Sequence, residues 1–330
     1  MGKILSLILS LMVTISLAGC SSNKAVATVN GTDIILGNYE KTLALNKSSM
    51  ELYYGSEIWS QEIEEGKTYE DSLKEMVLES MITSEVIYQK AEKEGISPTD
   101  KELQEEIDTF KEKIKNDDAY QKQLKEIGIN DKFFKYQFAR DLANDNLKNK
   151  FAKDANITDE QMKKYYEENK QSFYIDTVTA SHILIKTQDD KGNELSAEKK
   201  KEAKKKAEEI LAKVKAGDDF SELAKKYSED TASATNGGSL GTFGRNEMVA
   251  EFEDAAFDMT AGEVSELVES QFGYHIIKVS DRVNKQQTFD EVKDEIKDTL
   301  VDNEYNEYVV KLKDNSKVEA KEDIVKSVKF

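Results

Sequence analysis

The stretch TASHILIKT (residues 179–187) has the composition of a buried β-strand, yet it carries a histidine, His182. A second apolar stretch, FGYHIIKVS (residues 272–280), carries His275 in the same setting. The 330-residue chain has no further histidine, although 34% of its residues are charged. The whole histidine supply therefore lies inside two hydrophobic strands rather than on the charged surface.

The residues between these two strands predict a compact α+β module that extends from about Asp176 to Arg282. A helix should begin at Ser196 and end just before Gly217, because serine is a good N-cap and glycine a good helix terminator. A short helix, a glycine-rich loop and another helix should follow, in the order DFSELAKKYS, NGGSLGTFG and EFEDAAFDM. Strands and helices within about a hundred residues are enough for one small domain.

The regions on either side of the module have helical patterns. Asn30-Gly31 between apolar runs predicts a tight hairpin near the start. A broad apolar stripe from Leu73 to Val86 predicts a helix that ends near Gly95. Ser97 is the expected N-cap of the next helix, with Pro98 at its first position. Capping boxes start further helices, one formed by Thr158 with Gln161 and one by Thr288 with Glu291.

The segment after Arg282 is too short to build its own core. We expect it to dock as a helix on the N-terminal region. The predicted fold class is therefore α+β, with a small module inserted in a mainly α-helical domain formed from the N- and C-terminal segments. The expected limits are 1–19 for a signal peptide, 20–175 for the N-terminal helical segment, 176–282 for the module and 283–330 for the C-terminal segment.

The first twenty residues have the features of an export signal. Lys3 precedes an apolar run from Ile4 to Leu17, which is shorter than the roughly 20 residues that span a bilayer as a helix. Leu17-Ala18-Gly19-Cys20 resembles the bacterial lipobox, and this resemblance implies cleavage before Cys20 and attachment of a lipid to it. Cys20 is the only cysteine, which excludes an intramolecular disulfide. The mature protein is expected on the extracytoplasmic face of a cell membrane, held by its lipidated N-terminus.

Five motifs in the module follow the order typical of parvulin-type peptidyl-prolyl isomerases, and the module resembles that family. They are HIL at His182, FSELAKKYSED ending at Asp230, GGSLGTF, FEDAAF and FGYHII. With the lipobox and the helical flanks, the whole chain is similar to the PrsA-type foldase lipoproteins of Gram-positive bacteria. The flanks match by architecture more than by motif.

The resemblance implies that His182 and His275 form a hydrogen-bonded pair beneath the bound substrate. Period-two alternation agrees, since each histidine shares a strand face with apolar residues. Asp230 lies where some parvulins have a cysteine, which suits an orienting carboxylate and rules out attack by a thiol. By the same resemblance, the proline ring would bind a pocket formed by four apolar side chains: Leu240, Met248, Phe252 and Phe272.

Isomerisation of an X-Pro bond requires no metal and no cofactor, and none is expected. The barrier of about 18–20 kcal/mol comes from amide resonance, and an enzyme lowers it by favouring the twisted amide. The loop KTQDDKGNE is acidic on balance and lacks the arginines that read phosphate in phosphorylation-dependent parvulins. The expected substrates are unfolded or partly folded exported proteins with unphosphorylated X-Pro bonds.

Composition excludes several other classes. A formal net charge of −18 argues against nucleic acid as a partner. A zinc site would need more ligands near the histidine pair than the sequence supplies. Ser181 adjoins His182 in a strand and points to the opposite face, so the two cannot act as a hydrolase pair.

Two alternatives stay open. The first is a holding chaperone whose isomerase module has lost catalysis, and the second, less favoured, is a solute-binding lipoprotein. The hydrophobic helix faces of the flanks are compatible either with a homodimer or with the capture of client chains.

Overall fold

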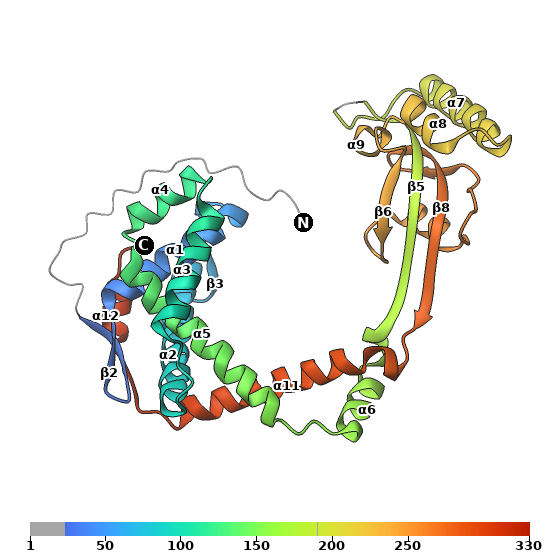
Figure 1. Cartoon of the computed structure of the whole chain (residues 1–330). Coiled ribbons are helices and arrows are strands. Elements are labelled where there is room, and N and C mark those ends of the chain that lie inside the picture. The colour runs from blue at the N-terminus through green and yellow to red at the C-terminus, as the bar shows by residue number, and fades with distance from the viewer. Residues whose placement is uncertain (1–23, 190) are drawn as a thin grey trace. The chain divides into compact units, whose positions relative to one another are not determined.

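The computed structural model describes residues 24–189 and 191–330 (Figure 1). It contains two compact units. Unit 1 consists of the described residues up to Ile157 together with Asp298–Phe330, and unit 2 is Thr158–Lys297. Cys20 and the predicted signal peptide lie outside the described residues.

Unit 1 is mainly helical. Its strands and helices before the division are β1 (Ala25–Val29), β2 (Thr32–Ile35), α1 (Leu36–Tyr54), η1 (Ser56–Ser60), β3 (Glu62–Glu64), β4 (Lys67–Thr68), α2 (Tyr69–Lys93), α3 (Asp100–Ile114), α4 (Asp118–Ile127) and α5 (Asp131–Asp154). From the C-terminal segment it receives the later part of α11 (Phe289–Asp314), β9 (Val318–Ala320) and α12 (Glu322–Ser327).

A small sheet joins the two ends of the chain within unit 1. Its strand order is β2-β1-β9, and Val29 on β1 pairs with Val318 on β9. The predicted hairpin between β1 and β2 is confirmed, with positive φ at Asn30 (49°) and Gly31 (91°). Val325 and Val328 are buried in the same core as α2. The prediction that both terminal segments build one helical domain is therefore confirmed.

The helix boundaries follow the capping chemistry with one correction. The capping box at Thr158 and the N-cap at Ser196 are present as predicted. The expected N-cap at Ser97 is wrong, because α3 begins after Thr99. The Thr99 side chain accepts the N–H of Glu102, whose carboxylate in turn accepts the N–H of Thr99. This reciprocal pair satisfies two backbone donors at the start of α3.

Unit 2 is built on a four-stranded antiparallel sheet. Its elements are α6 (Asp159–Glu168), η2 (Lys170–Phe173), β5 (Tyr174–Lys186), α7 (Ala197–Lys215), α8 (Phe220–Tyr227), α9 (Thr231–Ala234), β6 (Ser239–Phe243), α10 (Ala250–Phe257), β7 (Val268–Ser270), β8 (Gly273–Gln286) and the start of α11. The strand order is β6-β5-β8-β7. The two long strands β5 and β8 run side by side in its centre (Figure 1).

The two faces of this sheet have separate cores. Ile183 and Ile276 lie in a cluster with α7 and α8 on one face. Ala180, Ile277 and Val279 lie in a cluster with α10 on the other. This division follows from the alternation of side chains along β5 and β8.

Unit 2 also includes helices that lie outside the sheet in sequence, namely α6 and the start of α11. The ring of Tyr166 on α6 stacks on Phe173 at 5.5 Å between ring centres and meets Phe289 at 6.0 Å. These contacts join α6 and the start of α11 to Phe173, the residue before β5. The narrower limits of 176–282 for the isomerase domain stay a prediction.

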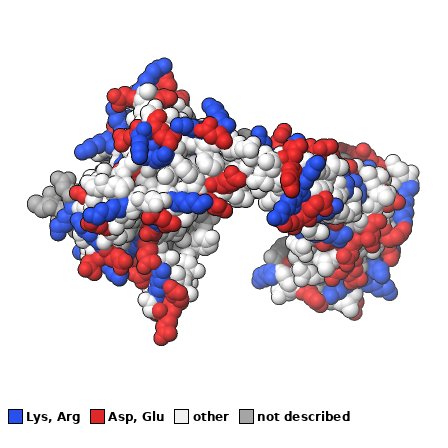
Figure 2. Space-filling view, turned by 90° about the horizontal axis from the view of Figure 1, so that it is seen from below, with Lys and Arg blue, Asp and Glu red and all other residues white. Residues whose placement is uncertain are grey.

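Acidic and basic side chains are intermingled on the face seen in Figure 2, as expected for a chain rich in both. Over residues 24–189 and 191–330, no helix is both long and apolar enough to cross a membrane.

Candidate active site

The register of the two central strands brings the histidines together. His182 on β5 is paired with Ile277 on β8, and His275 is paired with Leu184. The histidines are thus diagonal neighbours on the same face of an antiparallel pair, a position from which long side chains can touch. Their rings are 5.4 Å apart between centres and tilted by 24°. Both are buried, with exposed fractions of 6% and 3%.

A chain of hydrogen bonds runs through the pair. His182 Nδ1 and His275 Nδ1 are 3.2 Å apart, and His182 Nε2 lies 2.8 Å from Asp230 Oδ2. At the other end, His275 Nε2 lies 2.7 Å from the Ser270 hydroxyl. The Ser233 hydroxyl donates to Asp230 Oδ2. The structure thus brings the three sequence-predicted polar residues together and adds two serines.

The direction of these bonds follows from the ends. An ionised Asp230 only accepts, so His182 donates from Nε2 and must accept at Nδ1 if it is neutral. His275 then donates from Nδ1 and accepts at Nε2 from the Ser270 hydroxyl. Ser270 Oγ in turn accepts the N–H of Phe272 at 3.1 Å. When both imidazoles are neutral and have opposite tautomers, each of their four ring nitrogens has a hydrogen-bond partner.

Burial favours this neutral arrangement. It lowers the pKa of His275 from 6.5 to about 4; the neighbouring His182 adds to this effect, and Asp230 acts against it. Partial burial by itself would raise the pKa of Asp230, but the hydrogen bonds it accepts outweigh burial and lower that pKa. At neutral pH the site therefore holds one carboxylate at its edge and an uncharged His275 at its centre.

The glycine-rich loop allows the backbone to approach the first histidine. The N–H of His182 donates to the carbonyl of Gly238 at 2.8 Å. Gly238 has φ of +80°, and a Cβ there would lie 2.2 Å from the His182 carbonyl oxygen. Only glycine fits so close a contact in this backbone conformation. The loop therefore fixes the strand that carries His182.

The four apolar residues expected to bind proline differ in how close they lie to the histidine pair. The Phe252 ring meets both histidines edge to face, at 5.6 Å from His182 and 5.3 Å from His275 between ring centres. Leu240 and Met248 are partly buried against the same cluster as Phe252. Phe272 is 44% exposed and lies outside that cluster. It is joined to the site through its backbone bond to Ser270.

Sequence reasoning did not find the two serines. Ser270 is the last residue of β7, before the turn that leads to β8, and a serine at such a place commonly accepts the N–H two residues on, here that of Phe272. That pattern predicts a local turn and not a bond to His275. Ser233 lies within α9, and its spacing from Asp230 gives no sign of a function.

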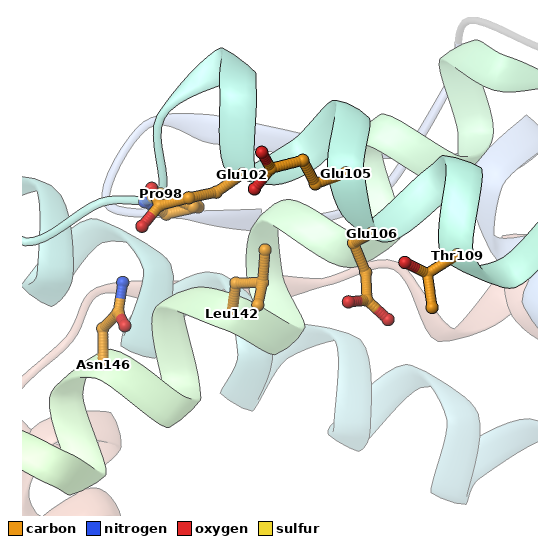
Figure 3. A pocket seen from close by; sticks show the side chains of 7 residues that line it. All are labelled: Pro98, Glu102, Glu105, Glu106, Thr109, Leu142 and Asn146. Carbon is orange, nitrogen blue, oxygen red and sulfur yellow. The ribbon is translucent and has the colours of Figure 1, made fainter.

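A separate hollow of about 230 Å³ lies in unit 1, between α3 and α5. Figure 3 shows its lining: Pro98, Glu102, Glu105, Glu106, Thr109, Leu142 and Asn146. Glu102 already serves as the capping partner of Thr99, and Asn146 donates to the Ile96 carbonyl. Three carboxylates make this hollow unsuitable for a proline ring. Within the described part of the chain, no three His, Cys, Asp or Glu side chains gather as metal ligands.

Two family models match this chain. A SurA-like N-terminal domain matches residues 2–148, and a PPIC-type PPIase domain matches residues 160–283. The foldase protein PrsA of Caldanaerobacter subterraneus subsp. tengcongensis is 37% identical over 315 residues, covering 93% of this chain and 91% of that protein. The foldase protein PrsA of Clostridium tetani is 29% identical and covers 97% of this chain and 95% of that protein.

Solved structures give matches of the same kind. The peptidylprolyl isomerase PrsA from Bacillus anthracis is 29% identical, with a TM-score of 0.29, and the match covers 72% of this chain and 94% of that one. PrsA from Bacillus subtilis is 25% identical, with a TM-score of 0.26, and the match covers 94% of both chains.

Proposed function

Because this chain belongs to the PrsA foldase family, we propose that it isomerises X-Pro bonds at the centre formed by His182, His275 and Asp230. The protein is a foldase and a parvulin-type peptidyl-prolyl cis-trans isomerase. The observation that supports the assignment of the centre is the hydrogen-bonded pair of buried histidines in contact with Phe252.

The proposed mechanism is non-covalent. A planar amide is stabilised by a polar resonance form, which is lost when the C–N bond twists. A site of low polarity therefore favours the twisted amide over the planar one, and this difference lowers the barrier. The uncharged His275 and the Phe252 ring supply such a surface. Asp230 holds His182 in one orientation and does not attack the substrate.

Replacement of His182 tests this assignment. We expect His182→Ala to lower kcat/KM for a proline-containing peptide by about tenfold or more, equivalent to 1.4 kcal/mol or more of transition-state stabilisation. Ser265→Ala is the matched control, because Ser265 is buried in the same unit and its hydroxyl accepts the N–H of Ile277 rather than bonding to either histidine ring. Equal rates for His182→Ala and wild type would instead favour a holding chaperone without catalysis.

We further infer that the protein acts outside the cytoplasm, anchored by a lipid on Cys20. The support is the short apolar leader followed by Leu17-Ala18-Gly19-Cys20. Its clients are unfolded exported proteins, as the foldase function implies. In a bacterial expression host, wild type should sediment with membranes and yield a lipid-modified N-terminal peptide in mass spectrometry. Cys20→Ser should yield no such peptide, and an unmodified Cys20 in wild type would refute the anchor.

A further inference from the structure

Asp230 is held by more than its bond to His182. It is the N-cap of the short helix α9, and its Oδ1 accepts the N–H of Ala232 at 3.2 Å. Its Oδ2 accepts from His182 Nε2 and also from the Ser233 hydroxyl. Ser233 is 4% exposed, so water cannot readily replace its hydroxyl.

The position of Ser233 is itself fixed by the loop that supports His182. The Ser233 carbonyl accepts the N–H groups of Asn236 and Gly238 at 2.9 and 3.0 Å. Gly238 then accepts the N–H of His182. Ser233 thus reaches the histidine by two routes, one through Asp230 to the ring and one through the loop to the strand.

We propose that Ser233 is a positioning residue of the isomerase, whose hydroxyl orients the Asp230 carboxylate so that His182 keeps its Nε2–H tautomer. The bonds of the site then run in one direction, from Ser270 through both imidazoles to Asp230. Without this hydroxyl, Oδ2 keeps one donor and the carboxylate can turn away from His182 or take up a proton. A protonated Asp230 could donate to His182 Nε2, and the tautomers of both rings would then reverse.

The charged and titratable groups around Asp230 are few in the described part of unit 2. His182 faces it from β5, and His275 lies behind His182 on β8. Glu229 precedes it in the chain, but the Glu229 carboxylate accepts the N–H of Lys186 and pairs with Lys206 on α7. Loss of the Ser233 hydroxyl would therefore act mainly on Asp230 and the two imidazoles.

The chain has two histidines, so selective ¹⁵N-histidine labelling of the full protein gives only four ring-nitrogen signals. At pH 7.5, wild type should show one ring protonated at Nε2 and the other at Nδ1, assigned with His182→Gln. In Ser233→Ala we expect averaged or reversed tautomers. Ser233→Thr keeps a hydroxyl and should restore the wild-type pattern, and Ser265→Ala should leave it unchanged.

The activity profile gives a second readout. Ser233→Ala removes a bond that stabilises the carboxylate, so the pKa of Asp230 should rise and activity should fall more at low pH. From the free energy of one hydrogen bond to a charged group, we expect a loss of kcat/KM of about tenfold or more near pH 5 and a smaller loss at pH 8. As long as both proteins stay folded over this pH range, a merely structural role would lower activity by the same factor at every pH.

The inference rests on the proposed function of the histidine pair, but the two can fail separately. An unchanged ring-nitrogen spectrum together with an unchanged pH profile in Ser233→Ala would overturn the role of Ser233, even if His182→Ala is inactive. An active His182→Ala would overturn the proposed centre, whatever the tautomers show.

Discussion

At the scale of single residues, the buried His275 links the site to the stability of unit 2. Its pKa is about 4 in the folded protein and 6.5 when the side chain is free in solution. Between these values the unfolded chain binds a proton that the folded chain does not. The free energy of unfolding should therefore be highest above pH 6.5. As the pH falls towards 4 it should decrease, by about 3 kcal/mol for a pKa shift of this size.

Hydrogen exchange of the β5 and β8 backbone amides measures this dependence. The comparison is with His275→Gln, which lacks the titrating group and keeps every other ionisable residue. We expect the difference in stability between wild type and variant to shrink as the pH falls from 6.5 to 4. A difference that stays constant over this range would contradict a buried, neutral His275.

Residue-scale prediction reached the histidines and Asp230 but not the serines. His182, His275 and Asp230 lie inside recognisable motifs, and the structure places them within hydrogen-bond distance. Ser270 and Ser233 meet them only through the packing of β7 and α9 on the sheet. No sequence pattern indicates which distant residue a serine hydroxyl will form a hydrogen bond with.

At the scale of elements, the glycine-rich loop is the support of the site, and two of its glycines allow a matched test. Gly238 and Gly241 have similar backbone angles, with φ of +80° and +74°. A Cβ on Gly238 would collide with the His182 carbonyl, whereas a Cβ on Gly241 would meet nothing within 4 Å. The two positions differ in packing and not in backbone strain.

Gly241→Ala should cost about 1–2 kcal/mol, from the left-handed backbone alone. Gly238→Ala adds a collision and should cost at least about 3 kcal/mol in total. Urea unfolding, with hydrogen exchange of the β5 amides as the readout, measures the loss of stability in both variants. Similar costs for the two variants would show that the loop does not press against His182.

The start of α3 shows why boundaries are harder to predict than helices. Ser97 and Thr99 are both good N-cap residues, and Pro98 fits the first turn of a helix that begins at Ser97. Ser97 has Asp100 three positions later and Thr99 has Glu102, and the structure forms the capping box between Thr99 and Glu102. The sequence therefore predicts the helix but not its first residue.

At the scale of the whole molecule, the C-terminal segment completes unit 1. Phe330, the last residue, meets the ring of Trp59 at 4.7 Å between centres, and Lys47 lies 4.5 Å from the Phe330 ring centre. Trp59 is the only tryptophan in the chain and 7% exposed. Its fluorescence therefore reports directly on the docking of the C-terminus.

Phe330→Ala should shift Trp59 emission to longer wavelength and lower the unfolding free energy of unit 1 by about 1–2 kcal/mol. Val310→Ala is the control, because Val310 is 58% exposed and its loss should change stability by less than about 0.5 kcal/mol. Identical urea midpoints for Phe330→Ala and wild type would mean that the terminal residue is not docked in solution.

The family, the fold class and the motifs of the isomerase module can be predicted from the amino-acid sequence. The comparisons confirm the family, and the sheet of unit 1 confirms that its two ends meet. These properties depend on short sequence motifs and on amino-acid composition, and both can be read directly from the sequence. The pairing register of β5 and β8, the direction of the hydrogen bonds and the contribution of Ser270 and Ser233 become visible only in the folded chain. Each depends on distances between residues far apart in sequence, and such distances are set by packing.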